Sequence, residues 1–480
     1  MNVAFQNWQK MNWLMNSLTL KPLEYLELRE AFQGGFTHAN ARAVGRTLTN
    51  IGSFDFTSSY PAVMIAEKFP MARGIEIGES TIDEIHHLSV NYCCLFRVEF
   101  NEIVSKTSVE HPLSSSKCRH LDPSKQREDD WVLDNGRIVA AKYLETTITE
   151  QDLFIYEDFY TWEHAEIHDL IIYRKQYLPT QFVKAILDLY KKKTELKDVE
   201  GQEVNYMVSK GMLNSAYGMT VTDIIREQLE YDGENYHSNY DGMTDEEYTN
   251  FLDSQIERYN HNRRRFLFYP WGVWVTAYAR RNLFDGIINT GNDYVYSDTD
   301  SIKIRNSESH FDYINRYNDL VVSKLRKACD FHKVGYEMIA PKNKYGKEKP
   351  LGVWDFEGIY DEFKTLGAKR YMWRKGDKWN LTVSGVNKST GIKYLLKIRD
   401  ELGVDPFDQF TFDLVVPSDY SGRLVLTYIH QPTEGDVIDY LGVPYHYKEE
   451  SSVHMEPTQY SMDKVLNFIE YLFTIKEEMW

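Results

Sequence analysis

Two carboxylates in one short segment, Tyr294–Ile304, are the side chains of this chain best suited to chemistry. The segment reads Tyr-Val-Tyr, then Ser-Asp-Thr-Asp-Ser, then Ile-Lys-Ile. Strand-forming residues on both sides of turn-forming ones are typical of a β-hairpin. Asp298 and Asp300 lie two residues apart at its tip, where their charges repel. Such a pair is often only an acidic turn, but rigid oxygen ligands also suit Mg²⁺, and a third carboxylate would complete a two-metal site.

Two further segments can supply the rest of such a site. Asp55 lies between a strand-like start and a Tyr-Pro break. Downstream, Lys210, Asn214 and Tyr217 follow one another at i, i+4 and i+7, so on a helix they share one face. A basic, amide and aromatic stripe that faces two acidic segments suits a nucleoside triphosphate. The lysine would bind phosphate, the tyrosine ring would contact the base, and the carboxylates would hold bridging metal ions.

The order of these segments resembles that of family B DNA polymerases. Asp-x-x-Ser-x-Tyr-Pro (55–61), Lys-x-x-x-Asn-Ser-x-Tyr-Gly (210–218) and Tyr-x-Asp-Thr-Asp-Ser (296–301) are similar to motifs A, B and C of that family. Lys369-Arg370-Tyr371 looks like its Lys-x-Tyr motif, which grips the primer end. Phe32-Gln33-Gly34-Gly35 resembles the Tyr-x-Gly-Gly motif of protein-primed bacteriophage members, with phenylalanine in place of tyrosine. Each motif alone is weak, whereas their shared order is a specific signal.

The resemblance implies a set of residues for nucleotide addition. Asp55, Asp298 and Asp300 would be catalytic, and with the Phe56 carbonyl they would bind two Mg²⁺ ions, for which Mn²⁺ can substitute. The residues expected to bind the incoming nucleotide are Tyr60, Lys193, Lys197, Lys210, Asn214 and Tyr217; those expected to contact primer or template are Gly34, Gly35, Ser215, Gly218, Thr299, Lys369 and Tyr371. The sequence leaves open which of Lys193 and Lys197 contacts the triphosphate.

Tyr60 resembles the family's steric gate, whose ring excludes a ribose 2′-hydroxyl and so favours DNA over RNA synthesis. Outside this motif, the same tyrosine would be read as a core aromatic beside Pro61. Ser59 stands where the family has leucine. The smaller side chain predicts looser packing behind the gate.

Composition limits the partners and the compartment. The formal charge of −17 argues against a simple nucleic-acid binder, because phosphate contacts need lysine and arginine. The basic residues nevertheless cluster, and three of the four clusters adjoin a motif. These clusters are Lys191–Lys193 with Lys197, Arg263–Arg265, Lys342–Lys349 and Lys369–Lys375. The chain start lacks a signal-peptide layout and no apolar run reaches membrane-spanning length, so we expect no membrane contact.

The four cysteines show no metal-ligand pairing. Cys118 with His111 and His120 is a zinc candidate of irregular spacing. A reducing cytoplasm, that of the host cell if the protein is viral, fits this cysteine usage best.

The expected fold class is α+β, a right-hand polymerase fold with a palm of antiparallel sheet plus helices, short two-helix fingers and a thumb. The divisions expected from the resemblance are an N-terminal region with the first palm part (1–73), an insertion like terminal-protein region 1 (74–177), fingers (178–221), a second, strand-displacement-like insertion (222–265), palm (266–386) and thumb (387–480). An ordinary palm elaboration is the alternative for 74–177. Fewer residues precede Asp55 than a 3′–5′ exonuclease domain needs. We therefore expect a polymerase module alone, either naturally short or one half of a split polymerase.

Periodicity predicts the main elements. Helical patterns cover 15–32, 180–197, 203–217, 245–259, 271–288, 311–331 and 462–478, and strand-like runs cover 90–100, 136–144 and 153–160. Residues 371–379 predict a hairpin that turns at Gly376.

Three functions are consistent with these patterns to different degrees. The first is a template-directed DNA polymerase that uses primer-template DNA and dNTPs, with protein-primed viral replication, a terminal-protein primer and a separate exonuclease subunit as its implied partners. The second is a catalytically inactive DNA-binding homologue, or a subunit of a split replicative polymerase. Three intact carboxylates argue against inactivity, because DNA binding has no use for them. The third, a reverse transcriptase or RNA polymerase, is disfavoured by Asp-Thr-Asp in place of adjacent aspartates and by Tyr60.

Overall fold

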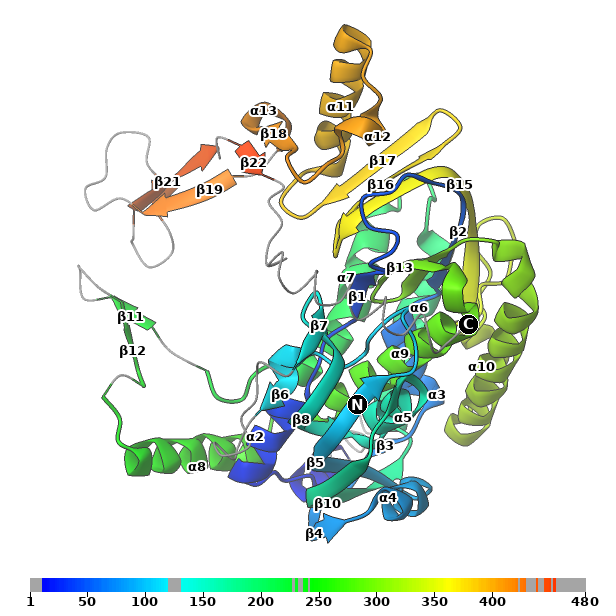
Figure 1. Ribbon diagram of the computed structural model, residues 1–480. Coiled ribbons are helices and arrows are strands. Elements are labelled where there is room, and N and C mark those ends of the chain that lie inside the picture. The colour runs from blue at the N-terminus through cyan, green and yellow to red at the C-terminus, as the bar shows by residue number, and fades with distance from the viewer. Residues whose placement is uncertain are drawn as a thin grey trace.

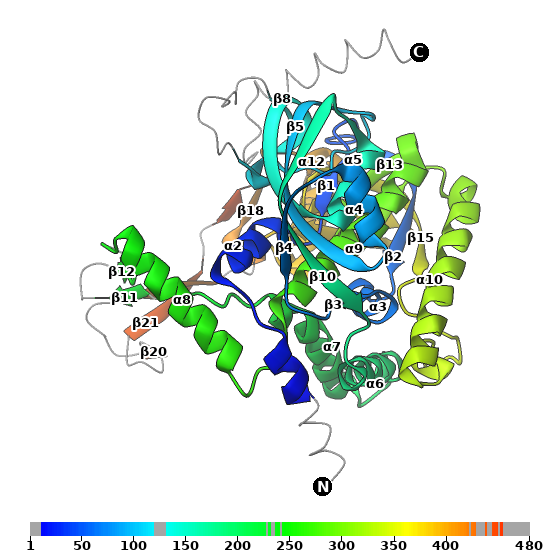
Figure 2. The same cartoon turned by 90° about the horizontal axis from the view of Figure 1, so that it is seen from below.

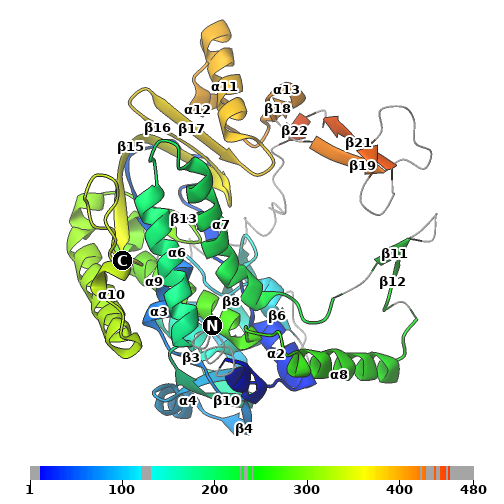
Figure 3. The same cartoon turned by 180° about the vertical axis from the view of Figure 1, so that it is seen from behind.

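The protein is described from a computed structural model. The structure describes residues 11–119, 131–226, 229–231, 236–240, 242–421, 424–428, 437–438, 444–449 and 452–454. The mixed helix-and-sheet architecture is shown from three directions in Figures 1, 2 and 3.

A seven-stranded antiparallel sheet carries the two acidic segments. In spatial order it contains β1 (Thr37–Ala39), β13 (Tyr294–Asp298), β14 (Ser301–Ile304), β2 (Leu48–Phe56), β15 (Trp354–Gly367), β16 (Arg370–Lys375) and β17 (Lys378–Val383). Strands that are far apart in sequence therefore become neighbours, with β14 hydrogen-bonded to β2. This pairing brings the 298–300 turn to the end of the strand that carries Asp55.

Alternation along the strands gives the sheet two different faces. Phe54 and Phe56 of β2, and Ile302 and Ile304 of β14, are buried in the main apolar core. The Phe56 ring stacks on Trp354 at a centroid distance of 3.5 Å. The residues between them, which include Asp55, therefore point to the opposite face.

Three helices cover the apolar face. They are α3 (Ser59–Ala66), α9 (Tyr269–Thr290) and α10 (Phe311–His332). Helix α9 packs against α3 and β14, and α10 packs against α3 and β15. None of the helices in the described part of the chain is long and apolar enough to cross a membrane.

A second sheet is built from the segment before the first long helix pair. It contains β3 (Phe69–Pro70), β10 (His164–Gln176), β5 (Tyr92–Ser105), β8 (Arg137–Thr149) and β6 (Cys118–Arg119), with β4 (Ile75–Ser80), β7 (Val132–Asp134) and β9 (Tyr160–Thr161) paired alongside. Helices α2 (Pro22–Ala31), α4 (Ile82–Ser89) and α5 (Glu150–Phe159) pack against it. Its apolar residues join the same core as the first sheet.

Helices α6 (Thr180–Leu196) and α7 (Glu203–Gly218) form a helical hairpin, and Figures 2 and 3 show the two helices side by side. Figure 1 shows α8 (Asp245–His261) projecting from the body next to α2, with the small β11–β12 hairpin (Leu229–Tyr231, Tyr236–Ser238) near its outer end. Beyond β17 lie α11 (Lys388–Leu402), α12 (Pro406–Gln409) and α13 (Ser418–Ser421), with strands β18 (Val415–Pro417) and β22 (Ser452–His454), and β19 (Leu424–Tyr428), β20 (Val437–Ile438) and β21 (Pro444–Glu449).

Most predicted elements are confirmed, with two corrections. The prediction of a strand at 153–160 is wrong, because this stretch lies in helix α5, where Thr149 caps the backbone N–H of Asp152. The helical run predicted over 15–32 is interrupted: residues 11–17 are helical, and a new helix begins at Pro22. The hairpin that turns at Gly376 is confirmed by β16 and β17. The helix predicted at 462–478 lies outside the described residues.

Candidate active site

Asp55 and Asp300 are brought together by the pairing of β2 with β14. Ser301 is the register partner of Asp55, and the Phe56 backbone N–H donates to the Asp300 carbonyl at 2.7 Å. Burial raises the pKa of Asp55 to about 7, with further increases from the Asp300 and Glu357 charges. Burial and the neighbouring Asp298 raise the pKa of Asp300 to about 6. The anionic forms therefore repel each other in a place with little water to screen them.

The turn between the two aspartates is held by a neighbouring segment. Thr299 has a positive φ of 58°, and its N–H donates to the Phe36 carbonyl at 2.6 Å. A Cβ on Gly35 would lie 2.5 Å from Thr299 Cγ2 and 2.9 Å from the Tyr60 hydroxyl oxygen. Gly35 must therefore lack a side chain because the turn and the Tyr60 ring pack directly against it. Gly34 has no atom within 4 Å of the equivalent position.

Asp298 is oriented differently from the other two aspartates. Its carboxylate accepts hydrogen bonds from Lys369 Nζ at 2.7 Å and from Thr37 Oγ1 at 2.9 Å. The carboxylates of Asp55, Asp298 and Asp300 do not all lie within 4.8 Å of one another. Asp300 therefore neighbours both Asp55 and Asp298, and Asp298 is in addition paired with the lysine predicted to grip the primer.

Lys369 and Tyr371 lie at the start of β16, beside the acidic turn. Lys369 has a positive φ of 55°, and its backbone N–H donates to the Tyr296 hydroxyl at 3.1 Å. The Tyr371 ring lies against Tyr296 with a centroid distance of 5.0 Å. Both predicted primer contacts are therefore next to Asp298.

A buried cation that the sequence reasoning missed lies under Asp55. Lys303 is only 4% exposed, and its Nζ donates to Ser53 Oγ at 2.8 Å. The Ser53 hydroxyl in turn donates to Glu357 at 2.7 Å, and the Tyr360 hydroxyl donates to Ser53 at 3.1 Å. The alternation of β14 could have placed Lys303 on the same face as Ser301, but its contact with Ser53 depends on the long-range pairing with β2.

The sequence leaves open whether Lys193 or Lys197 contacts the triphosphate. In the structure, Lys193 is the one that faces the aspartates. Its Nζ donates to Ser58 Oγ at 2.7 Å, directly after the Asp55 strand. Burial, then the nearby Lys210 and Lys197 charges, lower the pKa of Lys193, and Asp55 and Asp300 oppose that shift. Lys197 is exposed one turn further along, at the end of α6. Lys193 and Lys303 therefore both place positive charge beside the Asp55–Asp300 pair.

Helix α7 presents the other predicted nucleotide contacts. Lys210, Asn214 and Ser215 are exposed, and so is Gly218 at the end of the helix. Tyr217 is partly buried and packs on Tyr60, with ring centroids 4.3 Å apart. The pair links α7 to the helix that follows Asp55, and it places an aromatic surface beside the acidic residues.

The segment around Gly34 is fastened from helix α9. Arg280 donates from Nη1 to the carbonyl oxygens of Gln33 and Gly34, and its Nη2 forms a buried ion pair with Asp152 at 2.6 Å. Arg280 was not among the predicted residues. It lies at the end of the continuously buried run Tyr269–Arg280 of α9, and the local sequence gives no signal of this contact.

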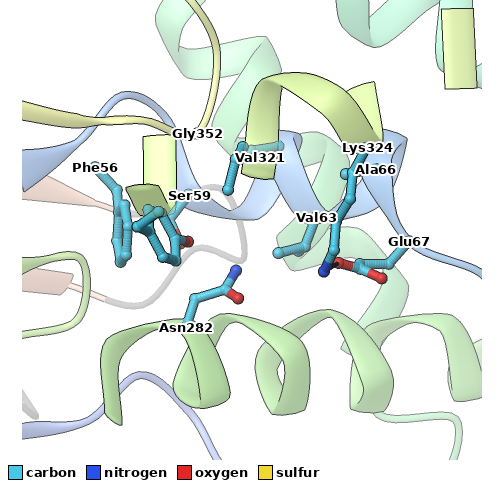
Figure 4. A pocket seen from close by; sticks show the side chains of 11 residues that line it. Phe56, Ser59, Val63, Ala66, Glu67, Asn282, Val321, Lys324 and Gly352 are labelled. Atoms are coloured by element: carbon cyan, nitrogen blue, oxygen red, sulfur yellow. Dashed lines mark hydrogen bonds and ion pairs between the residues drawn. The ribbon is translucent and has the colours of Figure 1, made fainter. Parts of the chain in front are cut away.

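A small cavity lies behind the helix that carries Tyr60. Figure 4 shows Phe56, Ser59, Val63 and Asn282 around it, and Lys324 paired with Glu67 at 2.7 Å. Its volume of about 20 Å³ has room for one water molecule. Ser59 is one of the residues that line this cavity.

The donor set fits hard divalent cations. Asp55 and Asp300 offer carboxylate oxygens on a backbone fixed by the β2–β14 pairing, and oxygen ligands are those Mg²⁺ prefers. The zinc candidate of Cys118 and His111 gains no support, because Cys118 Sγ donates to the Ser114 carbonyl and His111 Nδ1 contacts Ser105. His120 lies outside the described residues.

Comparison with known families is consistent with this geometry. The sequence profile described as DNA polymerase type B, organellar and viral, matches residues 4–265, which is more than half of the chain. The chain belongs to this family. The family B resemblance inferred from the motifs is thereby confirmed.

Curated relatives of this chain include the DNA polymerases of Bacillus phages Nf and M2. Each is 24% identical over 373 residues, which is 76% of this chain and 52% of the relative. The chain thus spans about half the length of the curated relatives it matches.

Solved structures show the same fold. Phi29 DNA polymerase complexed with primer-template DNA and incoming nucleotides matches with a TM-score of 0.54 and 17% identity, covering 90% of this chain and 63% of that one. Phi29 DNA polymerase complexed with single-stranded DNA matches equally well, with a TM-score of 0.54, 17% identity and coverage of 91% and 63%. The predicted α+β, right-hand polymerase fold is confirmed.

Proposed function

We propose that this chain is a template-directed DNA polymerase that adds dNTPs to a primer end. The observation that carries the proposal is the convergence of Asp55 and Asp300, more than two hundred residues apart, beside the lysines of the α6–α7 hairpin. Phosphoryl transfer needs positioning and charge neutralisation more than covalent chemistry. A half-buried carboxylate pair facing a basic helix hairpin supplies both.

Each residue has a distinct part in the proposed reaction. Asp55 and Asp300, with the Phe56 carbonyl, would hold two Mg²⁺ ions, which when bound would activate the primer 3′-hydroxyl and neutralise the triphosphate. Lys193 and Lys210 would contact the triphosphate as point charges. Asp298 would be a secondary ligand, released from Lys369 as that lysine turns to the primer end.

Residues on three segments would contact the nucleic acid and the sugar. Tyr60, supported by Tyr217, would exclude a ribose 2′-hydroxyl, while Asn214 would contact the incoming nucleotide. The remaining contacts to primer or template would come from Gly34, Gly35, Ser215, Gly218, Thr299 and Tyr371. Lys197, being exposed, would contribute only to the surrounding field.

The same proposal divides the chain by role. The palm would comprise the seven-stranded sheet with its helices (within 1–73 and 266–386), the fingers would be α6 and α7 (178–221), and the thumb would be 387–480. The second sheet (74–177) would correspond to the first insertion. Residues 222–265, which hold the β11–β12 hairpin and α8, would correspond to the strand-displacement insertion.

We extend the proposal to protein-primed viral replication, with a terminal protein as primer and proofreading supplied by a separate exonuclease subunit. Support comes from the Gly34–Gly35 segment, which lies against the acidic turn, and from the insertion-sized second sheet. A covalent bond between a small viral protein and a first nucleotide, formed by this chain, would be the direct sign of such priming.

Primer extension by the full chain tests the proposed activity. With Mg²⁺ and a primed template, we expect extension with dNTPs and none with rNTPs. Asp300→Ala should lower the rate by at least about 10³-fold, equivalent to about 4 kcal/mol of lost transition-state stabilisation. Glu308→Ala, which removes an exposed carboxylate downstream, is the matched control and should extend normally.

A DNA-binding assay on the same proteins distinguishes a polymerase from an inactive DNA-binding homologue. An inactive DNA-binding homologue would bind the primed template in both forms and extend it in neither. Extension by Asp300→Ala at the unsubstituted rate would remove the catalytic assignment. Retained DNA binding in Asp300→Ala would show that its loss of extension is not a loss of folding.

A further inference from the structure

A second group of metal-ligand side chains lies outside the acidic turn. His38 of β1, Glu110 from the connection after β5 and Asp134 at the end of β7 each offer a ligand atom, and these atoms all lie within 4.8 Å of one another. The three come from separate parts of the chain. They are 3%, 0% and 5% exposed, so the group is closed to solvent.

The side chains of this group contact one another directly. His38 Nδ1 lies 2.8 Å from Glu110 Oε1 and 2.9 Å from Oε2. His38 Nε2 is buried and has no hydrogen-bond partner within the described ranges. His111 Nε2, fully buried, lies 4.0 Å from Asp134 Oδ2. Two imidazoles and two carboxylates therefore meet in one buried place.

The charges and the burial argue for a cation. Two carboxylates are buried here beside Arg137 and an imidazole paired with Glu110, and burying carboxylate charge is unfavourable unless it is compensated. A single divalent ion would compensate it. The nearby Arg137 donates to the Pro112 carbonyl at 3.2 Å and lies over the Phe36 ring.

The ligand types select the ion. Imidazole nitrogen with carboxylate oxygen suits Zn²⁺, whereas Mg²⁺ prefers oxygen alone and keeps several waters. Glu110 is also held by the His111 backbone N–H at 2.9 Å and by the Tyr294 hydroxyl at 3.1 Å. Such outer hydrogen bonds orient ligands in metal centres.

We propose that His38, Glu110, Asp134 and His111 form a buried structural site for Zn²⁺, separate from the acidic residues of the proposed active site. The site would join the second sheet to the strand pair that carries the acidic turn. His38 is the register partner of Ser297, the residue before Asp298, so an ion bound to His38 would restrain that strand.

Metal analysis of the full chain tests this proposal. The protein is stripped with a chelator, equilibrated with Zn²⁺ and desalted into excess Mg²⁺, so that oxygen-only sites exchange. We expect about one zinc ion per chain in the unsubstituted protein, as in closed structural sites. Asp134→Asn and His38→Gln should lose it. His164→Gln, an exposed histidine paired with Glu166, and the double variant Asp55→Asn/Asp300→Asn should keep it.

A second readout does not depend on the variants. Co²⁺ in place of Zn²⁺ should give the visible absorption of a four-coordinate site in the unsubstituted protein, and restored Zn²⁺ should raise its Tm. Absence of retained zinc and of this absorption would overturn the proposal and leave a buried His38–Glu110 ion pair only. Full zinc retention by Asp134→Asn would overturn it equally.

Discussion

Asp55 and Asp300 are disfavoured as anions by burial and by their carboxylate neighbours, and a bound cation would relieve this repulsion. The pKa values of about 7 and about 6 express that tension. The positive charges of two lysines favour the anionic forms of these aspartates. Lys303 contacts Ser53 on the same strand as Asp55, and Lys193 lies on α6. Neither lysine bonds directly to Asp55, so the carboxylate oxygens remain available for metal ions.

Lys193 and Lys197 give a matched comparison at the proposed triphosphate site. Lys193→Ala should raise the KM for dNTPs by about 10- to 100-fold, because a charge-assisted contact contributes about 1.5–3 kcal/mol. Lys197→Ala should change it by less than about threefold, as expected for an exposed charge. Steady-state kinetics at saturating DNA measure both. A larger effect from Lys197 would contradict the assignment.

Tyr60 gives a test of sugar selection. Tyr60→Val removes the ring that packs on Tyr217, and incorporation of rNTPs relative to dNTPs should rise by on the order of 10²-fold. Tyr60→Phe keeps the ring and should keep the discrimination. Single-nucleotide incorporation measures the ratio. Equal selectivity in Tyr60→Val would show that the tyrosine is a packing residue only.

At the scale of elements, the segment between α2 and β1 works as a support for the acidic turn. Gly35 lies against Thr299 and Tyr60, Phe36 accepts the Thr299 N–H, and Arg280 fastens Gln33 and Gly34 from α9. The two glycine positions therefore differ in whether a side chain would fit. Gly35 is required by contact, whereas Gly34 is not.

Substitution of each glycine tests this support. Gly35→Ala should destabilise the fold by about 1–3 kcal/mol and slow extension, because its Cβ would force the 298–300 turn to shift. Gly34→Ala is the control for stability, and its Tm should be close to that of the unsubstituted protein, because a Cβ there meets no atom within 4 Å. Thermal unfolding and primer extension measure the two effects. Equal behaviour of the two variants would refute the contact argument.

Elements set by local signals could be predicted from the sequence. The Tyr294–Ile304 hairpin and helices α6 and α7 were predicted because alternation, turn residues and helical periodicity lie within each segment. The 153–160 stretch was misread because its aromatic and β-branched residues resemble a strand, while its start is set by the Thr149–Asp152 cap. The role of Lys303 depends on pairing between strands some 250 residues apart, which has no local signature.

At the scale of the whole molecule, the chain is negatively charged, but several of its lysines gather near the acidic turn. The formal charge is −17, yet Lys193, Lys210, Lys303 and Lys369 all lie around the acidic turn and the strand that carries Asp55. A strongly acidic remainder would repel DNA elsewhere and direct it to this region.

The proposed division of labour predicts no intrinsic proofreading by this chain. With Mg²⁺ and no dNTPs, a primer with a mismatched 3′ end should keep its length, because exonuclease chemistry needs a second carboxylate metal site. Gel analysis of the primer measures this. Shortening of the primer that survives Asp55→Asn/Asp300→Asn would contradict the proposal.

The central claim is that Asp55 and Asp300 jointly hold divalent cations at the primer end. The most direct measurement is anomalous diffraction from Mn²⁺-soaked crystals of this chain with primed DNA and a dNTP. The account predicts manganese peaks about 2.1 Å from carboxylate oxygens of both residues, with the triphosphate on the same ions. Peaks absent from these two carboxylates while DNA and nucleotide are bound would contradict it.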